Sequence, residues 1–327
     1  LAPRLVALLE DEHPTVRRTS ITSLGQVLKP YQKRGHALVM LNDTDPTVRA
    51  AAARVLVGAP HVSVVEPLTA RLTDRYTPVH DAARDALLAA MTDASSASVA
   101  TDAAVRLLSD TAPERRADGS WLLGRRKSSA GLRRHIDLMT DNILLVTAQA
   151  AESLGLVGRA EAGDALVSFV TRAKTFYTTA PTDENLPIAH ANAIISAALL
   201  GRADVLPPAS SMIGDKLNAP PLPRAAVIWA SGFLGDQSVA PRLIRIIQDP
   251  MDSGDAKFES IKALGNLRSK TAYGLLKPGA IPDTVRGDDA TNFVAHWAAD
   301  RIHNTTTPYE PAPVSYTPNL SVRDLTR

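Results

Sequence analysis

Apolar positions recur along this chain in short ladders, each followed by a polar turn and then by a run of smaller residues. The segments at 64–74 and 239–249 place Leu, Val and Ile three and four residues apart, which is the spacing of one helix face. Asp, Asn and Pro mark the turn, and the following run is rich in Ala, as in RAAAARVL at 49–56. This pattern predicts helical hairpins, in which Leu and Val of the first helix pack against a second helix of small residues.

The hairpin is repeated along the chain. Aligned on Leu24 and Gly25, the matching positions fall at Val57, Leu88, Gly124, Gly155, Gly201, Gly235 and Gly265, in steps of 32, 31, 36, 31, 46, 34 and 30 residues. A single hairpin cannot bury its apolar face, whereas a stack of hairpins can. We therefore predict an all-α fold, a right-handed α-solenoid of about eight or nine helix pairs over residues 1–303.

One turn motif occurs twice, as HPTVR at 13–17 and as DPTVR at 45–49. Together with Ala52 and Leu56, the second copy resembles the short HEAT-like repeats of about thirty residues, which also build the phycobilin lyases. Later repeats keep the helical ladder and lose the Val-Arg pair. The resemblance implies a stacked helical fold and leaves the function open, because such repeats occur in scaffolds, in adaptors and in a few enzymes.

The turn residues have predicted structural roles. Asp45 and Asp110 are candidate N-caps of second helices, and each is followed within three residues by a Pro that suits the first helical turn. Arg17 and Arg49 belong to the repeated motif, and we expect them to tie one repeat to the next through Asp residues of the turns.

Residues 173–187 interrupt the period. They contain turn formers and two aromatic residues, and they predict either an inserted loop or an extended first helix. Because loops on a rigid scaffold often carry recognition, Phe176 and Tyr177 are candidate protein-binding residues.

Residues 304–327 form a second irregular segment, rich in Pro and Thr. Pro at this density excludes a helix and predicts an extended C-terminal tail. We expect the tail to rest on another subunit, with Tyr309 and Tyr316 as the candidate contacts.

Composition narrows the chemistry. The chain has no Cys, which excludes disulfides, thiolate metal sites and thiol nucleophiles. Its residues are 45% hydrophobic but only 4% aromatic, so the apolar content is mainly aliphatic and suits helix packing. The net charge of +2 is too small to attract nucleic acid over the whole surface. No apolar run reaches the length of a membrane span.

Known catalytic and metal-binding patterns are absent from the sequence. The HEAT-like deoxyhypusine hydroxylases rely on paired His-Glu motifs, but none of the 8 His residues here is followed by Glu. His80 is isolated, and His296 and His303 lack a carboxylate at a useful helical spacing. Phosphate-binding loops, nucleophile elbows and zinc-protease motifs are also missing. We therefore expect a non-enzyme, with no catalytic, cofactor-binding or metal-binding residues.

The segment from Arg106 to Arg134 is locally basic, with eight Arg and Lys against three Asp and Glu. Alkylpurine DNA glycosylases hold duplex DNA on the basic concave surface of similar stacks. Here the basic residues do not continue across neighbouring repeats, so a surface for an acidic protein partner fits better. The candidate residues of this surface are Arg115, Arg116, Trp121, Arg125, Arg126 and Lys127.

These features predict a non-catalytic protein-binding scaffold or accessory subunit of a larger multiprotein complex. It would bind other subunits through the solenoid surface and the tail. A stack that is ordered before binding reduces the ordering cost of association. Nucleic-acid binding through residues 106–134 and a bilin-lyase-like activity are the two alternatives.

Overall fold

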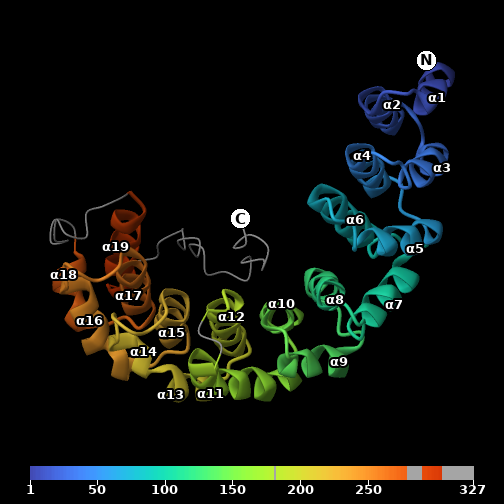
Figure 1. The fold of residues 1–327 in the computed structure, drawn as a ribbon. Coiled ribbons are helices and arrows are strands. Elements are labelled where there is room, and N and C mark those ends of the chain that lie inside the picture. Colours follow the sequence, from blue (N-terminus) through green and yellow to red (C-terminus); the bar gives the residue numbers. More distant parts are fainter. Residues whose placement is uncertain (180–181, 278–288, 304–327) are drawn as a thin grey trace. The chain divides into compact units, whose positions relative to one another are not determined.

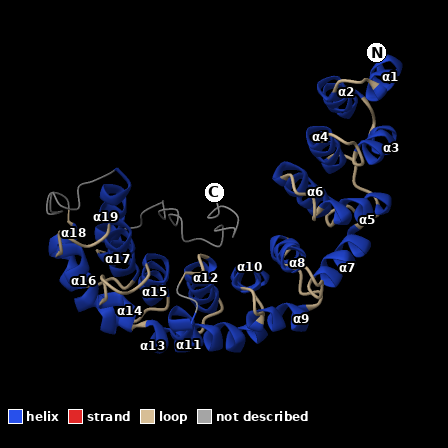
Figure 2. Ribbon diagram, viewed as in Figure 1, coloured by secondary structure: helices blue, strands red, loops and turns tan. Residues whose placement is uncertain are grey.

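The computed structural model describes residues 1–179, 182–277 and 289–303 (Figure 1). Within these ranges every regular element is a helix (Figure 2). First and second helices alternate, and the described ranges contain nine such pairs. The predicted all-α solenoid is confirmed, whereas the predicted tail at 304–327 lies outside the described residues.

The helix pairs form two compact units, unit 1 over Leu1–His135 and unit 2 over Ile136–Arg327. The single repeat domain over residues 1–303 stays a prediction. Among the described helices, none combines the length and the apolar character that crossing a membrane requires.

Unit 1 contains four helix pairs. Each first helix packs against the second helix of its own pair, and the second helices pack against one another in chain order. A short 3₁₀ turn, η1 (Leu8–Glu10), follows α1. The first helices are α1 (Ala2–Ala7), α3 (Pro30–Met40), α5 (Val62–Arg71) and α7 (Ala97–Leu107), and the second helices are α2 (Pro14–Val27), α4 (Pro46–Val57), α6 (Thr77–Ala90) and α8 (Pro113–Arg125).

Unit 2 continues the alternation, with second helices that again pack in series. The helix α9 (Leu132–Asp137) spans the boundary between the units. The second helices are α10 (Leu144–Val157), α12 (Asn185–Leu199), α15 (Pro221–Phe233), α17 (Gly254–Asn266) and α19 (Asp289–Ile302). The first-helix positions hold η2 (Leu138–Thr140), η3 (Ala160–Ala162) with α11 (Gly163–Thr179), η4 (Ala203–Val205) with α13 (Leu206–Ala209) and α14 (Ser211–Gly214), η5 (Gln237–Val239) with α16 (Ala240–Gln248), and η6 (Lys270–Ala272) with α18 (Tyr273–Leu276).

The core of each unit is aliphatic and built from small residues. In α4 the whole run Ala50–Ala53 is buried, so the helices on either side approach closely. Leu24 and Leu123 of unit 1 are fully excluded from solvent, as are Leu154 and Leu264 of unit 2. The Leu of the repeated Leu-Gly pair is therefore a core residue in these repeats.

The Leu-Gly alignment places two repeats one helical turn too far along the chain. Gly201 and Gly235 come after the ends of α12 and α15, with φ of +75° and +79°. The true counterparts lie inside the helices, at Ala198 and Gly232, where a Cβ added to Gly232 would lie 2.5 Å from the Cα of Ala263. Glycine ends some helices and, inside others, allows a neighbouring helix to approach closely. Leu precedes Gly in both roles, which explains why the alignment is wrong in these two repeats.

Gly119→Ala is expected to destabilise unit 1 by about 1–3 kcal/mol, because the new methyl group has no space. Its Cβ would lie 2.7 Å from the carbonyl oxygen of Ala104 and 2.7 Å from the Cβ of Leu107. Gly35→Ala in α3 is the matched control, since no atom beyond its chain neighbours and its own helix backbone lies within 4 Å of the Cβ position. That change should stabilise by about 0.5–1 kcal/mol, as Ala normally does in a helix. Urea denaturation measures both, and equal effects would contradict the close packing of α7 and α8.

Only one of the two predicted Asp caps is correct. The Asp45 carboxylate accepts the backbone N–H groups of Thr47 and Val48 at 2.8 and 3.4 Å and caps α4. For Asp110 the prediction is wrong, because the N-cap of α8 is Ala112. Asp110 stands two residues earlier and closes the turn by accepting the Ala112 N–H at 3.0 Å. The Pro in the first helical turn is present in both helices, as predicted.

Arg residues near the start of second helices bind Asp residues of the next turn, and we call these pairs the clamps. Arg17 donates to both carboxylate oxygens of Asp43 at 2.7 Å, and Arg49 donates to Asp74 at 2.8 and 3.0 Å. Each clamp joins one repeat to the next, which confirms the structural role predicted for both Arg residues. Such bidentate geometry fixes the register of neighbouring repeats.

Unit 2 contains a more deeply buried clamp. Arg224 donates to the two carboxylate oxygens of Asp252 at 2.5 and 2.8 Å and to the carbonyl oxygen of Ile213 at 3.1 and 3.2 Å. The Arg224 and Asp252 side chains are only 6% and 4% exposed. Burial by itself would raise the pKa of Asp252, but the hydrogen bonds from Arg224 hold it below its ordinary value.

The segment 173–187 is mostly helical. The helix α11 continues to Thr179 and α12 begins at Asn185, so the predicted inserted loop is wrong for residues 173–179 and the extended first helix is correct there. The helix continues because Ala173 is buried on its inner face and two aromatic residues extend the apolar ladder.

Candidate binding surface

The basic segment predicted as a single surface is divided by α8. Arg115 and Arg116 stand in its first turn, and Arg125 and Arg126 stand at its end, about 15 Å further along the axis. Arg116 donates to the carbonyl oxygens of Asp110 and Thr111 at 2.9 and 3.0 Å, and it thereby supports the turn. The Nε atom of Arg115 lies 3.3 Å from the Asp110 carboxylate.

At the other end of α8, Arg125 and Trp121 do come together. Trp121 is 8% exposed, and the guanidinium groups of Arg84 and Arg125 lie 4.0 and 5.5 Å from the centroid of its ring. These cation–π contacts make Trp121 part of the packing between α6 and α8. Arg126 and Lys127 are exposed, and Lys127 ends the helix with a φ of +50°.

The predicted aromatic contacts of α11 point partly into the protein. The Phe176 ring lies 5.8 Å from that of Phe169 and 5.9 Å from the Arg172 guanidinium. The Tyr177 hydroxyl lies 3.2 Å from Nδ1 of His190 in α12, and burial raises the pKa of that hydroxyl. Both side chains are half-buried and tie α11 to its surroundings. The other two candidates, Tyr309 and Tyr316, lie outside the described residues.

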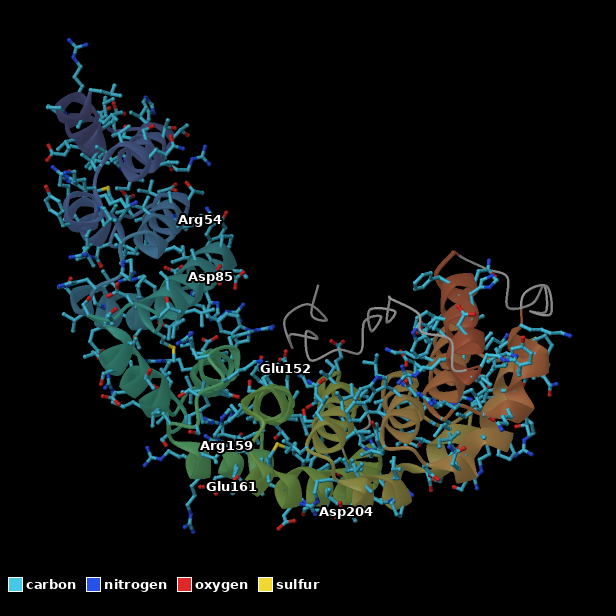
Figure 3. The ribbon with its side chains drawn as sticks, turned by 180° about the vertical axis from the view of Figure 1, so that it is seen from behind. Arg54, Asp85, Glu152, Arg159, Glu161 and Asp204 are labelled. Atoms are coloured by element: carbon cyan, nitrogen blue, oxygen red, sulfur yellow. The ribbon has the colours of Figure 1, made fainter. Side chains whose placement is uncertain are left out.

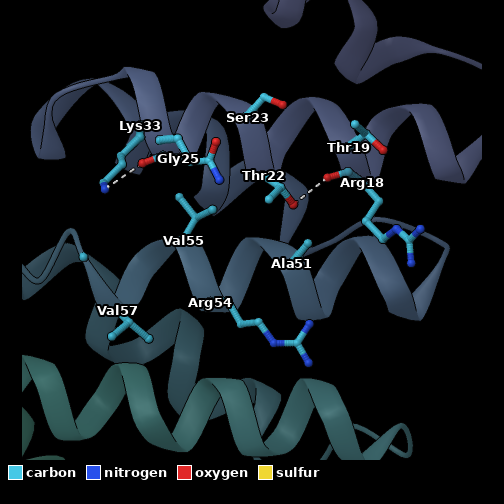
Figure 4. Close-up of a pocket in the computed structure, with 12 residues that line it drawn as sticks. Arg18, Thr19, Thr22, Ser23, Gly25, Lys33, Ala51, Arg54, Val55 and Val57 are labelled. Carbon is cyan, nitrogen blue, oxygen red and sulfur yellow. Dashed lines mark hydrogen bonds between the residues drawn. The ribbon is translucent and has the colours of Figure 1, made fainter.

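A groove between α2 and α4 is the surface feature that the sequence reasoning missed. It has a volume of about 570 Å³ and runs along the two second helices of unit 1 (Figure 4). Three cationic side chains line it together with hydroxyl, amide and apolar groups. The lining consists of Arg18, Thr19, Thr22, Ser23, Gly25, Gln26, Lys33, Ala51, Arg54, Val55, Val57 and Gly58.

The charge of the groove is positive throughout, because no Asp or Glu contributes to its lining. Arg18 of α2 and Arg54 of α4 are exposed and lie toward one end, whereas Lys33 lies toward the other (Figure 4). Lys33 donates to the carbonyl oxygen of Gly25 at 3.0 Å. Among the described residues, no carboxylate forms an ion pair with Arg18 or Arg54.

The electrostatic surroundings of the groove include one carboxylate on the next second helix. Asp85 of α6 and Arg54 lie on the same side of unit 1 (Figure 3). Burial raises the pKa of Asp85, while the positive charges of Arg84 and Arg54 act in the opposite direction. Asp85 therefore marks the edge of the positive region.

The comparison with known protein families decides what these repeats are. Residues 1–88, which include α1 to α5 and most of α6, match the family described as HEAT repeats. This part of the chain carries HEAT repeats. A search of curated proteins finds no match to the chain.

Solved structures similar to this chain include three with low sequence identity. The X-ray structure of YIBA_ECOLI, from E. coli, is 16% identical, with 93% of this chain and 92% of that chain covered and a TM-score of 0.48. The complex of CpcE and CpcF of phycocyanin lyase from Nostoc sp. PCC7120 is 15% identical, with coverage of 84% and 95% and a TM-score of 0.41. An engineered protein is 19% identical, with coverage of 60% and 96% and a TM-score of 0.35.

Within the repeat register of unit 1, the position five residues after the clamp position varies strongly in chemistry. In unit 1 it is occupied by Thr22, Arg54, Asp85 and Trp121, of which the first three are exposed. We call it the variable position. The clamp position itself holds Arg17, Arg49, His80 and Arg116, all of which bind neighbouring polar groups.

The second helices of unit 2 carry buried polar groups as well. Glu259 in α17 is fully excluded from solvent, and neither of its carboxylate oxygens has a hydrogen-bond partner among the described residues. Burial raises the pKa of Glu259 to about 7, although the charge of Lys262 acts in the opposite direction. In the described part of the chain, no three His, Asp or Glu side chains gather as metal ligands.

Proposed function

We propose that this HEAT-repeat chain is a non-catalytic protein-binding scaffold or accessory subunit of a multiprotein complex. The observation that carries the proposal is the α2–α4 groove, an open positive surface between two packed helices. Within the part of the chain that the structure describes, its two Arg side chains form no ion pair with a carboxylate. A surface that is already ordered loses little conformational entropy on binding. Binding through the C-terminal tail, with Tyr309 and Tyr316, belongs to the same proposal.

The basic segment 106–134 supports nucleic-acid binding less well than its charge alone suggests. Arg116 supports a turn, Arg125 lies over Trp121, and Arg106 pairs with Glu66. Duplex binding requires an extended stripe of cations facing successive phosphates. Residues engaged at both ends of one helix do not supply such a stripe.

Purification of the native protein under mild conditions tests this function. We expect the chain to elute with at least one protein partner, and the purified partner to bind the purified chain again in size-exclusion chromatography. Elution of the chain alone at cellular concentration would contradict a scaffold. Duplex DNA binding that falls steeply with salt and is lost on Arg125→Glu with Arg126→Glu would favour the nucleic-acid alternative instead.

A further inference from the structure

The α2–α4 groove combines three features that define its ligand. Its charged groups are all cations, and two of them, Arg18 and Arg54, come from facing helices of consecutive repeats. Arg guanidinium groups recognise carboxylates through charge-assisted, often bidentate hydrogen bonds. The lining also contains Thr22, Ser23 and Gln26, whose hydroxyl and amide groups can bond to the backbone of a ligand.

The spacing of the helices fits an extended peptide. Packed helices lie about 8–10 Å apart, and alternate side chains of an extended chain are about 6.6 Å apart on one side. A peptide that crosses the groove can therefore present one carboxylate to α2 and the carboxylate two residues further along to α4. The volume of about 570 Å³ accommodates a short segment of this kind.

The next repeat limits how long the acidic stretch is. Asp85 occupies the variable position of α6, directly after Arg54 in the repeat order. A carboxylate at this place repels further acidic residues or phosphates that continue beyond the groove. A ligand whose negative charge is confined to a few residues fits this arrangement better than a long polyanion such as duplex DNA.

We propose that the α2–α4 groove binds a short acidic peptide segment of a partner protein. The segment lies extended across the two helices, and its Asp or Glu carboxylates pair with Arg18 and Arg54. Lys33 marks the far end of the groove, where it is held by the Gly25 carbonyl group. This assignment rests on the proposed binding function and names the chemistry of the partner.

Fluorescence anisotropy with the full chain tests the assignment. The probe is a labelled short peptide of alternating Asp and Ala, and the control peptide has Asn in place of Asp. We expect the Asp peptide to bind, and Arg18→Glu with Arg54→Glu to weaken its affinity by at least about tenfold. Arg133→Glu with Arg134→Glu makes the same charge change on exposed residues of α9 and should leave the affinity unchanged.

Three results would overturn the groove assignment: equal binding of the Asn peptide, equal losses in both double variants, or tighter binding of a duplex oligonucleotide than of the Asp peptide. The melting temperature of each variant checks that folding is intact. If the native partner remains bound to the groove variant, this assignment fails while the scaffold function stands. If no protein partner is found at all, the function itself fails.

Discussion

Asp252→Ala is expected to lower the free energy of unfolding by about 3 kcal/mol, the largest single effect that the clamps predict. The substitution removes the carboxylate that accepts two hydrogen bonds from Arg224, whose side chain is only 6% exposed. The guanidinium then stays buried with the Ile213 carbonyl group as its remaining acceptor. Leaving one charge buried without its partner costs more free energy than the intact ion pair contributes to stability. Urea denaturation, followed by circular dichroism, measures the loss.

Asp204→Ala is the matched control in the same unit. Asp204 also accepts two hydrogen bonds from one Arg, at 2.9 and 2.6 Å from Arg202, but its side chain is 54% exposed. Water replaces the lost interactions there, so the free energy of unfolding should change little. Equal losses in the two variants would show that burial of the clamp is not what makes it important.

Glu259→Gln is expected to stabilise unit 2 at pH 8 by about 3 kcal/mol and to change stability little near pH 4.5. In the folded chain the pKa of Glu259 is raised to about 7, above its ordinary value of 4.5. The contribution of the protonated Glu259 to wild-type stability is therefore fully present below pH 4.5. It is lost as the pH rises through about 7, where the buried carboxyl group must ionise. Gln resembles the protonated acid in shape and carries no charge, so it avoids this loss.

The difference between the variant and wild-type unfolding free energies, measured from pH 4.5 to pH 8, isolates Glu259 from other titrating groups. Glu161→Gln is the control, because Glu161 is an exposed carboxylate of the same unit. Its substitution should leave the pH dependence unchanged. If the free-energy difference between Glu259→Gln and the wild type were the same at every pH, burial would not raise the pKa of Glu259.

The fold was predictable because its determinants repeat. The PTVR motif places Arg17 and Arg49 in the same register, and turn Asp residues follow at matching distances, so their pairing followed from the sequence. Errors arose where one residue type has two roles. Glycine after Leu ends some helices and separates others, and an Asp in the turn either caps the helix, as Asp45 does, or closes the turn, as Asp110 does.

The candidate binding surface was harder to predict, because sequence proximity is a poor guide to shared surfaces on a helix. Arg116 and Arg125 belong to one basic segment but lie at opposite ends of α8. Arg18 and Arg54 belong to different repeats and line one groove only because α2 packs against α4. The usable signal was the offset of each residue from the clamp Arg of its own repeat. Arg18 directly follows Arg17, and Arg54 follows Arg49 by five residues.

The separation between the clamps and the variable position has a consequence for how such chains diverge. The clamps hold neighbouring repeats at the turns, while Thr22, Arg54 and Asp85 stand exposed elsewhere on the same helices. Substitutions at exposed sites away from structural contacts usually change stability by less than about 0.5 kcal/mol. Selection can therefore rewrite ligand preference one repeat at a time, and a designer can exchange these residues as independent modules without rebuilding the scaffold.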